Sequence, residues 1–328
     1  MRPVFSFRRR FLVAATALAC VAPAAVLAQS GYPSKPIKFV VGYPAGGSVD
    51  QMGRVIGEAM ARRLNGVAVV ENLGGAAGAI GAQRVVNSAP DGYTLLAGSS
   101  NELVATRQIN PAQRYDARKD LTPIGMVAWA PVILAAGPKT GISSLAELVA
   151  EARKHPGKYS YGSSGVGSTL HFAGELFKQQ AGLAMTHIPY RGVAPLTSDL
   201  VGGSLDLAVL SPTAAVPFIK TGRIKPLAVT GSKRIPSLPD VPAMNELPEL
   251  KNYELAGWFA IMAPRGLPEA LRSKLAETLQ QTLQDPAVRA NLEAAGMEMA
   301  TGREDLGKLL ADESAKYAQL VKFGGMRE

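Results

Sequence analysis

The sequence predicts an α/β fold, and two observations support this. Short β-rich apolar runs alternate with segments whose apolar residues recur at helical spacing, an order typical of proteins built on parallel sheets. Several strands also run directly into glycine- and hydroxyl-rich loops that open a helix, as in Tyr43–Ser48. The mature part of the chain, about 300 residues, is long enough to bury two domain cores.

The first third of the chain contains three strand–loop–helix units. Ser48, with Gln51 three residues later, forms a capping-box pattern at the start of the first helix, which extends to about Leu64. The second helix ends near Ser88. The strands predicted here are 37–41, 67–71 and 93–97. The third strand ends at Gly98–Asn101, a further candidate ligand loop.

The middle of the chain continues the alternation. A long apolar strand is predicted over Ile124–Ala136, followed by a helix over Leu145–Lys154. Further strands are predicted at 159–162, 187–190, 206–210 and 224–230. Helices are predicted to begin near Thr169, Pro195 and Pro212, the last two opened by proline in the first turn.

The last third of the chain begins with a proline-rich loop and is then mostly helical. The loop covers 235–248. Leucines at four-residue steps, Leu271, Leu275 and Leu279, mark the first of the helices that follow. The predicted helices are 268–283, 286–295 and 303–323.

The N-terminus predicts export. Four arginines precede an apolar stretch from Phe11 to Leu27, and Val26-Leu27-Ala28 supplies small residues for signal peptidase, so residues 1–28 are predicted to be removed. The stretch is short for a membrane span of about 20 apolar residues. Arg8–Arg10 leaves both the Sec and the twin-arginine routes open.

Composition excludes several classes of function. Removal of residues 1–28 lowers the formal net charge from +9 to +5 and takes away Cys20, the only cysteine, which excludes disulfides and thiolate sites from the mature chain. The basic residues form no stripe interleaved with aromatics, so nucleic acid is not expected as a partner. The three histidines are dispersed, and neither a metal nor another cofactor is predicted.

Three junctions between a strand and a helix carry glycine and hydroxyl groups and almost no charge. A helix start has unpaired N–H groups and the positive end of the helix dipole, and glycine lets a ligand approach the backbone. The sequence therefore predicts a site for a small anion. The junctions are 43–48, 162–169 and 190–195.

The mature chain resembles the periplasmic solute-binding proteins of tripartite tricarboxylate transporters, the Bug group. The opening motifs are Tyr32–Ile37 and Tyr43–Asp50. The others are Glu71-Asn72, Gly74–Gly81, Pro90–Leu95, Tyr161–His171, Pro189–Gly192, Asp199-Leu200 with Gly202-Gly203, Leu238–Pro242, and Trp258 with Ala263-Pro264. The ordered set covers essentially the whole mature chain.

The resemblance implies a type II periplasmic-binding-protein fold, in which two α/β lobes enclose a ligand cleft and the chain crosses between them twice. We place one lobe at residues 32–126 and 230–328 and the other at 127–229. A carboxylate is expected between loop 43–50 of one lobe and loop 163–169 of the other. Ligand then favours the closed state, because only that state completes the contacts.

The predicted ligand-binding residues come from both lobes. Those of the first lobe are Tyr43, Ala45, Gly46, Gly47, Ser48, Asp50, Ser99 and Asn101. Those of the second lobe are Ser163, Ser164, Gly165, Gly167, Ser168, Thr169, Tyr190, Arg191 and Asp206. Trp129 is a further candidate for contact with the variable part of the ligand.

Several of these residues also have a purely structural interpretation. Ser48 and the hydroxyls of loop 163–169 can cap their helices. Asp50 can stabilise its helix through the dipole or position a ligand through water. Arg191 is either a partner for a second carboxylate or an architectural residue. Asp206 is better interpreted as an orienter of loop amides than as a base, and His171 is expected to be structural.

An enzymatic alternative rests on Gly162–Val166, which approaches the G-x-S-x-G elbow with Ser164 as nucleophile and His155, His171 or His187 as base. Val166 breaks the motif, so the sequence predicts a binder and not an enzyme. A dicarboxylate, tricarboxylate, amino acid or aromatic acid would be delivered to a tripartite tricarboxylate-type permease by a monomeric protein. A sensor subunit that signals to a membrane kinase remains open, because it would use the same binding chemistry.

Overall fold

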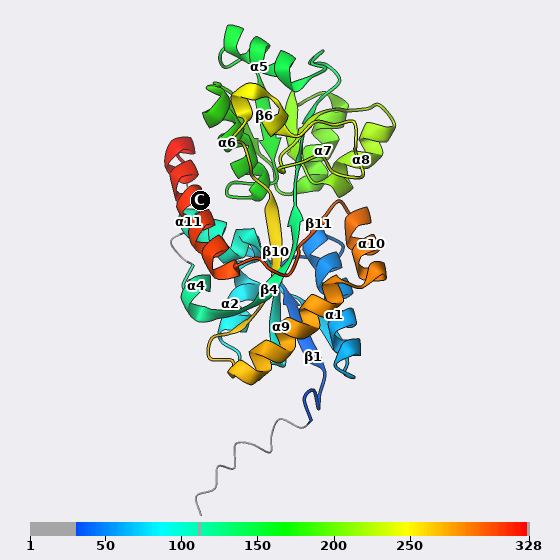
Figure 1. Ribbon diagram of the computed structural model, residues 1–328. Helices are drawn as coiled ribbons and strands as arrows, with labels where there is room; N and C mark the ends of the chain where they lie inside the picture. Colours follow the sequence, from blue (N-terminus) through cyan, green and yellow to red (C-terminus); the bar gives the residue numbers. More distant parts are fainter. Residues whose placement is uncertain (1–30, 111–112, 327–328) are drawn as a thin grey trace, which may run out of the picture.

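The structure, a computed structural model, describes residues 31–110 and 113–326. The predicted signal peptide lies outside the described residues. Two β-sheets, each covered by helices, form two bodies stacked one on the other (Figure 1). We call them the first lobe, which contains the chain start, and the second lobe.

The sheet of the first lobe has six strands in the order β11-β4-β10-β3-β1-β2. Their bounds are β1 (Ile37–Val41), β2 (Ala68–Asn72), β3 (Thr94–Ser99), β4 (Leu121–Ala130), β10 (Gly257–Pro264) and β11 (Glu298–Met299). β1 is parallel to both of its neighbours, whereas β10 is antiparallel to β3 and β4. The eight residues of β10 are all buried.

The sheet of the second lobe has five strands in the order β7-β6-β8-β5-β9. Their bounds are β5 (Ile133–Ala136), β6 (Ser160–Ser163), β7 (Thr186–Pro189), β8 (Leu207–Leu210) and β9 (Lys225–Val229). β5 is antiparallel to β8 and β9. Both sheets are therefore mixed: the parallel pairs that the alternation predicted are joined by antiparallel ones. β5 and β10 enter their sheets from the other lobe, without the helical crossover that makes consecutive strands parallel.

Helices cover both faces of each sheet. In the first lobe, α1 and α9 lie on one face and α2 on the other, while α11 runs beside both lobes (Figure 1). The bounds in this lobe are α1 (Ser48–Arg63), η2 (Ala76–Gly78), α2 (Ala79–Val86), η3 (Asn101–Ala105), α3 (Thr106–Ile109), α4 (Ala117–Asp120), α9 (Glu269–Leu283), α10 (Pro286–Ala294) and α11 (Leu306–Gly324). Those in the second are α5 (Leu145–Lys154), α6 (Thr169–Ala181), α7 (Val193–Gly202), α8 (Pro212–Lys220), η4 (Met244–Glu246) and η5 (Pro248–Leu250).

The chain passes between the lobes at two places that lie side by side. The backbone N–H of Thr230 donates to the Val132 carbonyl at 2.9 Å, and the Val132 N–H donates to Oγ1 of Thr230 at 3.0 Å. Leu255 N–H donates to the Thr230 carbonyl at 3.2 Å. Pro131, which lacks an N–H, separates β4 from β5, so the single long strand predicted over Ile124–Ala136 is two strands in different sheets.

The division by sheets differs from the predicted lobe boundaries at 127 and 230. β4 continues in the first sheet to Ala130. The proline-rich segment after β9 stays with the second lobe, since Ala243 bridges Val229 and η5 packs on α6. The chain returns to the first lobe only at Gly257, where β10 begins. The boundaries by sheet are therefore about 131 and 257.

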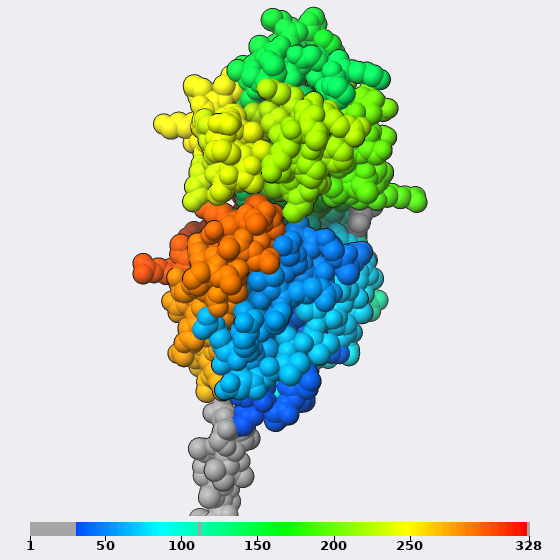
Figure 2. Space-filling view, turned by 90° about the vertical axis from the view of Figure 1, so that its right-hand side faces the viewer, coloured from blue at the N-terminus to red at the C-terminus, as the bar shows by residue number. Residues whose placement is uncertain are grey.

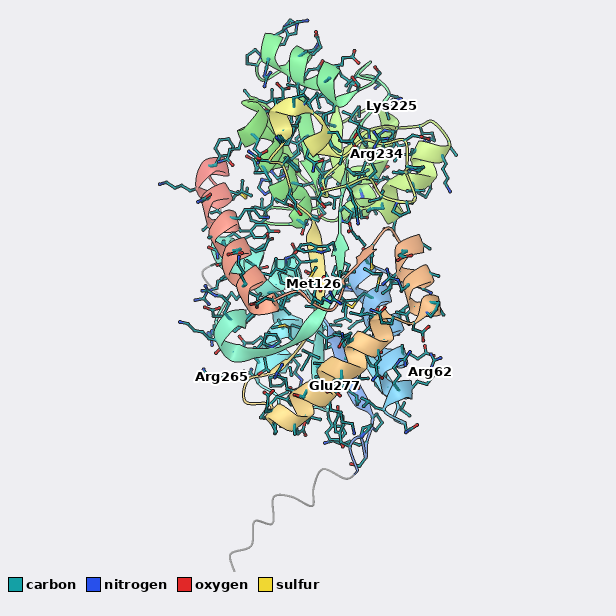
Figure 3. The ribbon with its side chains drawn as sticks, viewed as in Figure 1. Arg62, Met126, Lys225, Arg234, Arg265 and Glu277 are labelled. Atoms are coloured by element: carbon teal, nitrogen blue, oxygen red, sulfur yellow. The ribbon has the colours of Figure 1, made fainter. Side chains whose placement is uncertain are left out.

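The outer surface and the boundary between the lobes differ in charge. In Figure 3 the charged side chains of Arg62, Lys225, Arg234, Arg265 and Glu277 lie on the outside of the lobes, where all five are exposed. Figure 2 shows the boundary running across the molecule, with the α1 and α10 segments directly below it. The residues of the cavity at this boundary are described next.

Candidate ligand site

A cavity of about 940 Å³ lies between the lobes. Among the described residues that line it, none is charged. Its wall contains the residues Tyr43–Val49 without Gly46, Ala77, Ser99–Asn101, Ala130–Val132, Ser164–Leu170 without Gly167, Gly192–Ala194, Ser211–Thr213, Gly257, Phe259 and Ala295–Met297. Apolar side chains such as Val132, Val166 and Phe259 alternate with hydroxyls, which suits a ligand with a carbon skeleton and polar ends.

Four helices begin at this wall. The N-cap residues of α1, α6, α7 and α8 are Gly47, Ser168, Gly192 and Ser211, and all four line the cavity. Only Ser168 accepts a capping hydrogen bond with its side chain. Each helix start carries a partial positive charge of about half an elementary charge. The wall is therefore electropositive without containing a cationic side chain.

The loop before α1 is held from below by Asp50. Its carboxylate accepts hydrogen bonds from the Gly46 N–H at 2.9 Å, the Arg54 Nε at 3.0 Å and the Asn72 Nδ2 at 2.8 Å. The amide of Asn72 also donates to the Tyr43 carbonyl at 3.0 Å. Burial alone would raise the pKa of Asp50, but these hydrogen bonds outweigh it and lower the pKa to about 2. Asp50 thus fixes the loop from outside the cavity.

Ser48 does not cap α1. The N-cap is Gly47, and Ser48 is the first helical residue, so the predicted capping box is wrong. The hydroxyl of Ser48 makes no hydrogen bond with the described residues and lines the cavity. It is therefore available to a ligand, which a capping serine would not be.

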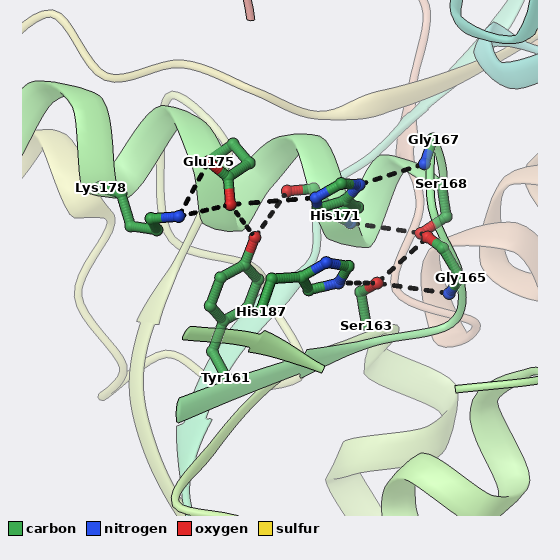
Figure 4. Close-up of polar contacts among 9 residues, drawn as sticks. All are labelled: Tyr161, Ser163, Gly165, Gly167, Ser168, His171, Glu175, Lys178 and His187. Carbon is green, nitrogen blue, oxygen red and sulfur yellow. Dashed lines mark hydrogen bonds and ion pairs between the residues drawn. The ribbon is translucent and has the colours of Figure 1, made fainter. Parts of the chain in front are cut away.

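Most polar groups of the loop before α6 form hydrogen bonds within the protein (Figure 4). The Ser168 hydroxyl accepts from the His171 N–H at 3.2 Å and donates to the Gly165 carbonyl at 2.8 Å. Ser163 is fully buried, and its hydroxyl lies 2.7 Å from Nε2 of His187. Ser164 lines the cavity and makes no hydrogen bond with the described residues. Ser164 is thus the free hydroxyl of this loop.

A histidine pair supports this loop from behind. The rings of His171 and His187 stack with centroids 3.8 Å apart. The Gly167 N–H donates to Nδ1 of His171 at 3.1 Å, so the ring proton lies on Nε2, which faces Oε1 of Glu175 at 3.8 Å. Burial lowers the pKa of His171 to about 4, and burial together with the neighbouring His171 lowers that of His187 to about 3. Both rings are therefore neutral at pH 7.

The negative charge of Glu175, which lies behind the histidine pair, is neutralised by Lys178 on the same helix. Glu175 is buried and accepts from Nζ of Lys178 at 2.7 Å and from the Tyr161 hydroxyl at 2.6 Å (Figure 4). This network contains a serine, histidines and a carboxylate, yet the serine bonded to a histidine is Ser163, which lies outside the cavity wall. In the part of the chain that the structure describes, no hydrogen bond joins Ser164 to a histidine, in contrast to the Ser163–His187 pair.

The two lobes meet directly at Asn101. Its side-chain oxygen accepts from the Thr169 N–H at 3.1 Å and from the Thr169 hydroxyl at 2.8 Å. Nearby, a Cβ on Gly167 would lie 1.7 Å from Cδ1 of Ile109 in the first lobe. These contacts join η3 and α3 of the first lobe to the start of α6 in the second, so the lobes touch across the cleft.

Comparison with known proteins identifies the family. The model of the tripartite tricarboxylate transporter family receptor matches residues 52–326. The chain belongs to this receptor family. BugT of Bordetella pertussis is 34% identical over 308 residues, which is 93% of this chain and 94% of that protein. The family members are solute-binding proteins of transporters, so this chain is a solute-binding receptor with a periplasmic-binding-protein fold.

Two solved structures of relatives contain carboxylates. R. palustris Rpa4515 with adipate has a TM-score of 0.80 and 31% identity, and the match covers 90% of this chain and 99% of that one. MatC from Rhodopseudomonas palustris with bound malate has a TM-score of 0.75 and 29% identity, over 88% of this chain and 100% of that one. Adipate and malate are ligands of those proteins.

The receptor cavity collects ten of the predicted ligand-binding residues. They are Tyr43, Ala45, Gly47, Ser48, Ser99, Asn101, Ser164, Gly165, Ser168 and Thr169. Another four lie directly behind the wall and shape its loops: Gly46, Asp50, Ser163 and Gly167.

Three predicted residues and Trp129 do not line the receptor cavity. Tyr190 donates its hydroxyl to Asp199 at 2.9 Å, and Arg191 is exposed. Asp206 accepts from the N–H and the hydroxyl of Ser160, both at 2.8 Å. Ser160 begins β6 and the cavity lies beyond its end, so Asp206 orients the opposite edge of the sheet.

Sequence reasoning missed several residues in and behind the cavity wall, among them Ser211–Thr213, Ala295–Met297 and Glu102. Ser211–Thr213 opens α8 at the end of β8, and the strand–loop–helix rule used for the other junctions would have found it. Ala295–Met297 follows α10 and carries no such signal. Glu102 is fully buried in η3, directly behind Tyr43 and Ser99, and burial raises its pKa to about 7.

Within residues 31–110 and 113–326, no group of three or more histidine, cysteine or acidic side chains is arranged to hold a metal ion. In the same part of the chain, none of the helices has the length and apolar character needed to cross a membrane.

Proposed function

We propose that this receptor captures a small organic carboxylate between its lobes and delivers it to a tripartite tricarboxylate-type permease. The observation that carries the proposal is the convergence of four helix N-termini, from both lobes, on a cavity wall without charged side chains. Such a wall attracts an anion through backbone N–H groups and helix dipoles. The carboxylates in the two solved relatives support the same ligand class.

The proposed contacts divide between the lobes. In the first lobe the amides of the loop before α1 and the hydroxyls of Ser48 and Tyr43 face the ligand. In the second lobe Ser164 and the starts of α7 and α8 face it. The described residues of the wall include no carboxylate that could pair with an ammonium group, which favours acids that carry no cation over amino acids. Val132, Val166 and Phe259 would contact the carbon skeleton.

A thermal-shift series tests this ligand class. Refolded, ligand-stripped protein would be screened with adipate, malate and aromatic acids, and with the neutral diamide and the diamine of matched length. A ligand present at 100 times its Kd stabilises the native state by about 2.7 kcal/mol. We expect stabilisation by acids only. Equal stabilisation by the diamide would contradict anion recognition by helix N-termini.

Closure is measured separately. Ligand should lower the radius of gyration in small-angle scattering and slow hydrogen exchange at loops 43–50 and 163–169 together. Protection of only one loop would place the site within a single lobe. A receptor that acts as a monomer would show this change at constant molecular mass.

Binding without turnover is expected. Ser164→Ala should change ligand affinity by about 0.5–1.5 kcal/mol, the range for one neutral hydrogen bond. Wild-type protein should show no ester hydrolysis above buffer and no labelling by a serine-directed phosphonate. Stoichiometric labelling at Ser164 that His187→Ala abolishes would support a hydrolase instead.

The proposed location is the periplasm, after cleavage behind Ala28. Mass spectrometry of the exported protein should find Gln29 as its first residue. Deletion of the cognate permease genes distinguishes uptake from sensing. Loss of growth on the bound acid supports uptake, whereas unchanged uptake with altered transcription supports a sensor.

A further inference from the structure

Glu102 lies behind the cavity wall and contacts two of its residues. Its carboxyl group follows β3 on η3 and is fully buried. Oε1 accepts from the Ser99 N–H at 2.6 Å. Oε2 lies 2.5 Å from the Ser99 hydroxyl and 2.8 Å from the Tyr43 hydroxyl. Tyr43 and Ser99 face the cavity, so Glu102 is one side chain away from a bound ligand.

Two hydroxyls supply two protons to four close contacts around Glu102, and a protonated Glu102 supplies a third. The Tyr43 hydroxyl also lies 2.8 Å from the Ala77 carbonyl and 3.1 Å from Oγ of Ser99. The Ala77 carbonyl can only accept, so Tyr43 must donate to it to satisfy that contact. The 2.8 Å contact between Tyr43 and Oε2 is then a hydrogen bond only if Glu102 supplies the proton. Geometry therefore favours a neutral carboxylic acid.

The surroundings of Glu102 offer no compensating positive charge. It takes part in none of the ion pairs among the described residues. On α11, Lys316 pairs with Glu313, next to Tyr317. On α3, Arg107 donates to the Tyr115 carbonyl at 2.7 Å, while the Tyr115 hydroxyl donates to the Glu102 carbonyl.

The remaining neighbouring elements add no partner. On α2, which packs against η3, Arg84 is exposed to solvent. β3 and η2 carry no ionisable side chain. Burial raises the pKa of Glu102 to about 7, in agreement with the proton required by the hydrogen-bond geometry.

We propose that Glu102 is a proton-linked positioning residue, which orients Tyr43 and Ser99 as a neutral acid and must stay neutral for an anion to bind beyond them. The inference rests on the proposed function, because the ligand must be an anion. Ionised Glu102 would place a negative charge directly behind the Tyr43 and Ser99 hydroxyls, which face the cavity. A bound carboxylate would then face electrostatic repulsion.

The pH dependence follows from the sign of this coupling. A bound anion disfavours ionisation of Glu102 and raises its pKa above the ligand-free value. Between these two pKa values, binding takes up one proton from solvent. Affinity is constant below about pH 7 and weakens above it, by about tenfold for each unit by which the ligand raises the pKa.

Infrared difference spectroscopy tests the proton without any ligand. Ligand-stripped wild-type protein should show the band of a buried protonated carboxyl group at pH 6, and the band should disappear as the pH rises through about 7. Glu102→Gln should lack this band. Glu58→Gln, on the exposed face of α1, is the control and should retain it. Absence of the band from wild-type protein at pH 6 would overturn the proposal.

Calorimetry tests the coupling. Adipate and malate would be titrated at pH 6.5, 7.5 and 8.5 in two buffers of different ionisation enthalpy. Wild-type protein and Glu58→Gln should take up protons on binding and lose about tenfold in affinity across the range. Glu102→Gln should keep the low-pH affinity without proton uptake, because its amide nitrogen donates to Tyr43 as the neutral acid does.

Different outcomes would contradict the proposed function and the coupling of ligand binding to protonation of Glu102. Tight binding with no proton uptake in wild-type protein would overturn the coupling and leave the proposed function intact. Failure of every acid in the thermal-shift screen would overturn the proposed function, whereas the infrared experiment would still decide whether Glu102 carries the proton.

Discussion

The loops before α1 and α6 both bring glycine and hydroxyl groups to the cavity, yet they use their hydrogen bonds differently. The first is held from outside by Asp50, which leaves the hydroxyl of Ser48 without a protein partner. The second satisfies itself through Ser163, Ser168 and His171, and it is tied to the other lobe by Thr169. The first loop is thus supported from outside, whereas the second is supported mainly by its own hydrogen bonds and by the other lobe and leaves only Ser164 free among its hydroxyls.

The largest effect on stability is expected when Asp50, which supports the loop before α1, is replaced. Asp50→Ala leaves Arg54 and Asn72 without their partner and should lower the free energy of unfolding by about 2–3 kcal/mol, less than for a fully buried pair because Arg54 is half exposed. Urea denaturation measures the loss. Glu58→Ala, which breaks an exposed pair on the same helix, is the control and should cost almost nothing.

Acid sensitivity gives a second readout of Asp50. Its pKa is depressed in the folded state, so its contribution to stability is present above the ordinary aspartate range and is lost as pH falls toward about 2. Asp50→Asn should flatten that part of the stability curve. An unchanged curve would contradict the support assigned to Asp50.

The next largest effect is expected from a substitution that prevents the two lobes from closing on the ligand. Gly167→Ala would place a Cβ 1.7 Å from Cδ1 of Ile109, at a φ of +73°. Ligand affinity should fall by more than tenfold, about 1.4 kcal/mol, and scattering should show the open form at concentrations that close the wild type. Gly182→Ala is the matched control, since Gly182 has a similar φ of +65° but no atom within 4 Å. Ile109→Ala should restore part of the affinity to Gly167→Ala.

The interlobe hydrogen bonds should contribute somewhat less. Asn101→Ala removes the acceptor of both Thr169 bonds, and the affinity for the best acid of the screen should fall by about 1–1.5 kcal/mol. Asn87→Ala, at the exposed end of α2, should leave calorimetric affinity unchanged. Equal affinities of the Asn101 variant and the wild type would mean that this contact does not select the closed form.

The smallest effects are expected for single serine substitutions, and these distinguish the loop before α1 from the loop before α6 most clearly. Ser168→Ala removes a helix cap and should cost about 1 kcal/mol of stability. Ser48→Ala should leave stability unchanged and weaken ligand binding by about 0.5–1.5 kcal/mol. Paired denaturation and calorimetry on both variants provide the measurement. If Ser48→Ala destabilised the protein as Ser168→Ala does, the contrast between the loops would be wrong.

The sequence predicted residues of the cavity wall where local chemistry decides the structure. Strand ends with glycine and hydroxyls placed ten predicted residues on the cavity wall, because such loops open helices wherever they occur. The capping box at Ser48 failed because Gly47 takes the N-cap position, and the hydrogen bonds of the loop come from Asp50.

The sequence did not allow contacts between distant segments of the chain to be predicted. β10 is buried throughout and has neither alternation nor helical period, so it was overlooked in a part of the chain interpreted as helical. Pro131 did mark the break between β4 and β5, but a continuous apolar run concealed the change of sheet. Glu102 carries no signal in the sequence, because only the fold brings Tyr43 and Tyr115 to it.

The uncharged cavity wall also has a kinetic consequence. The described lining includes no lysine or arginine whose long side chain could follow a departing ligand, and the field of a helix end fades within about one turn. Opening the lobes by a few ångströms should therefore remove most of the electrostatic attraction between the helix ends and the ligand in one step. We expect affinity to vary among ligands through the dissociation rate, to change little with salt because the contacts are buried, and to collapse when a permease pulls the lobes apart.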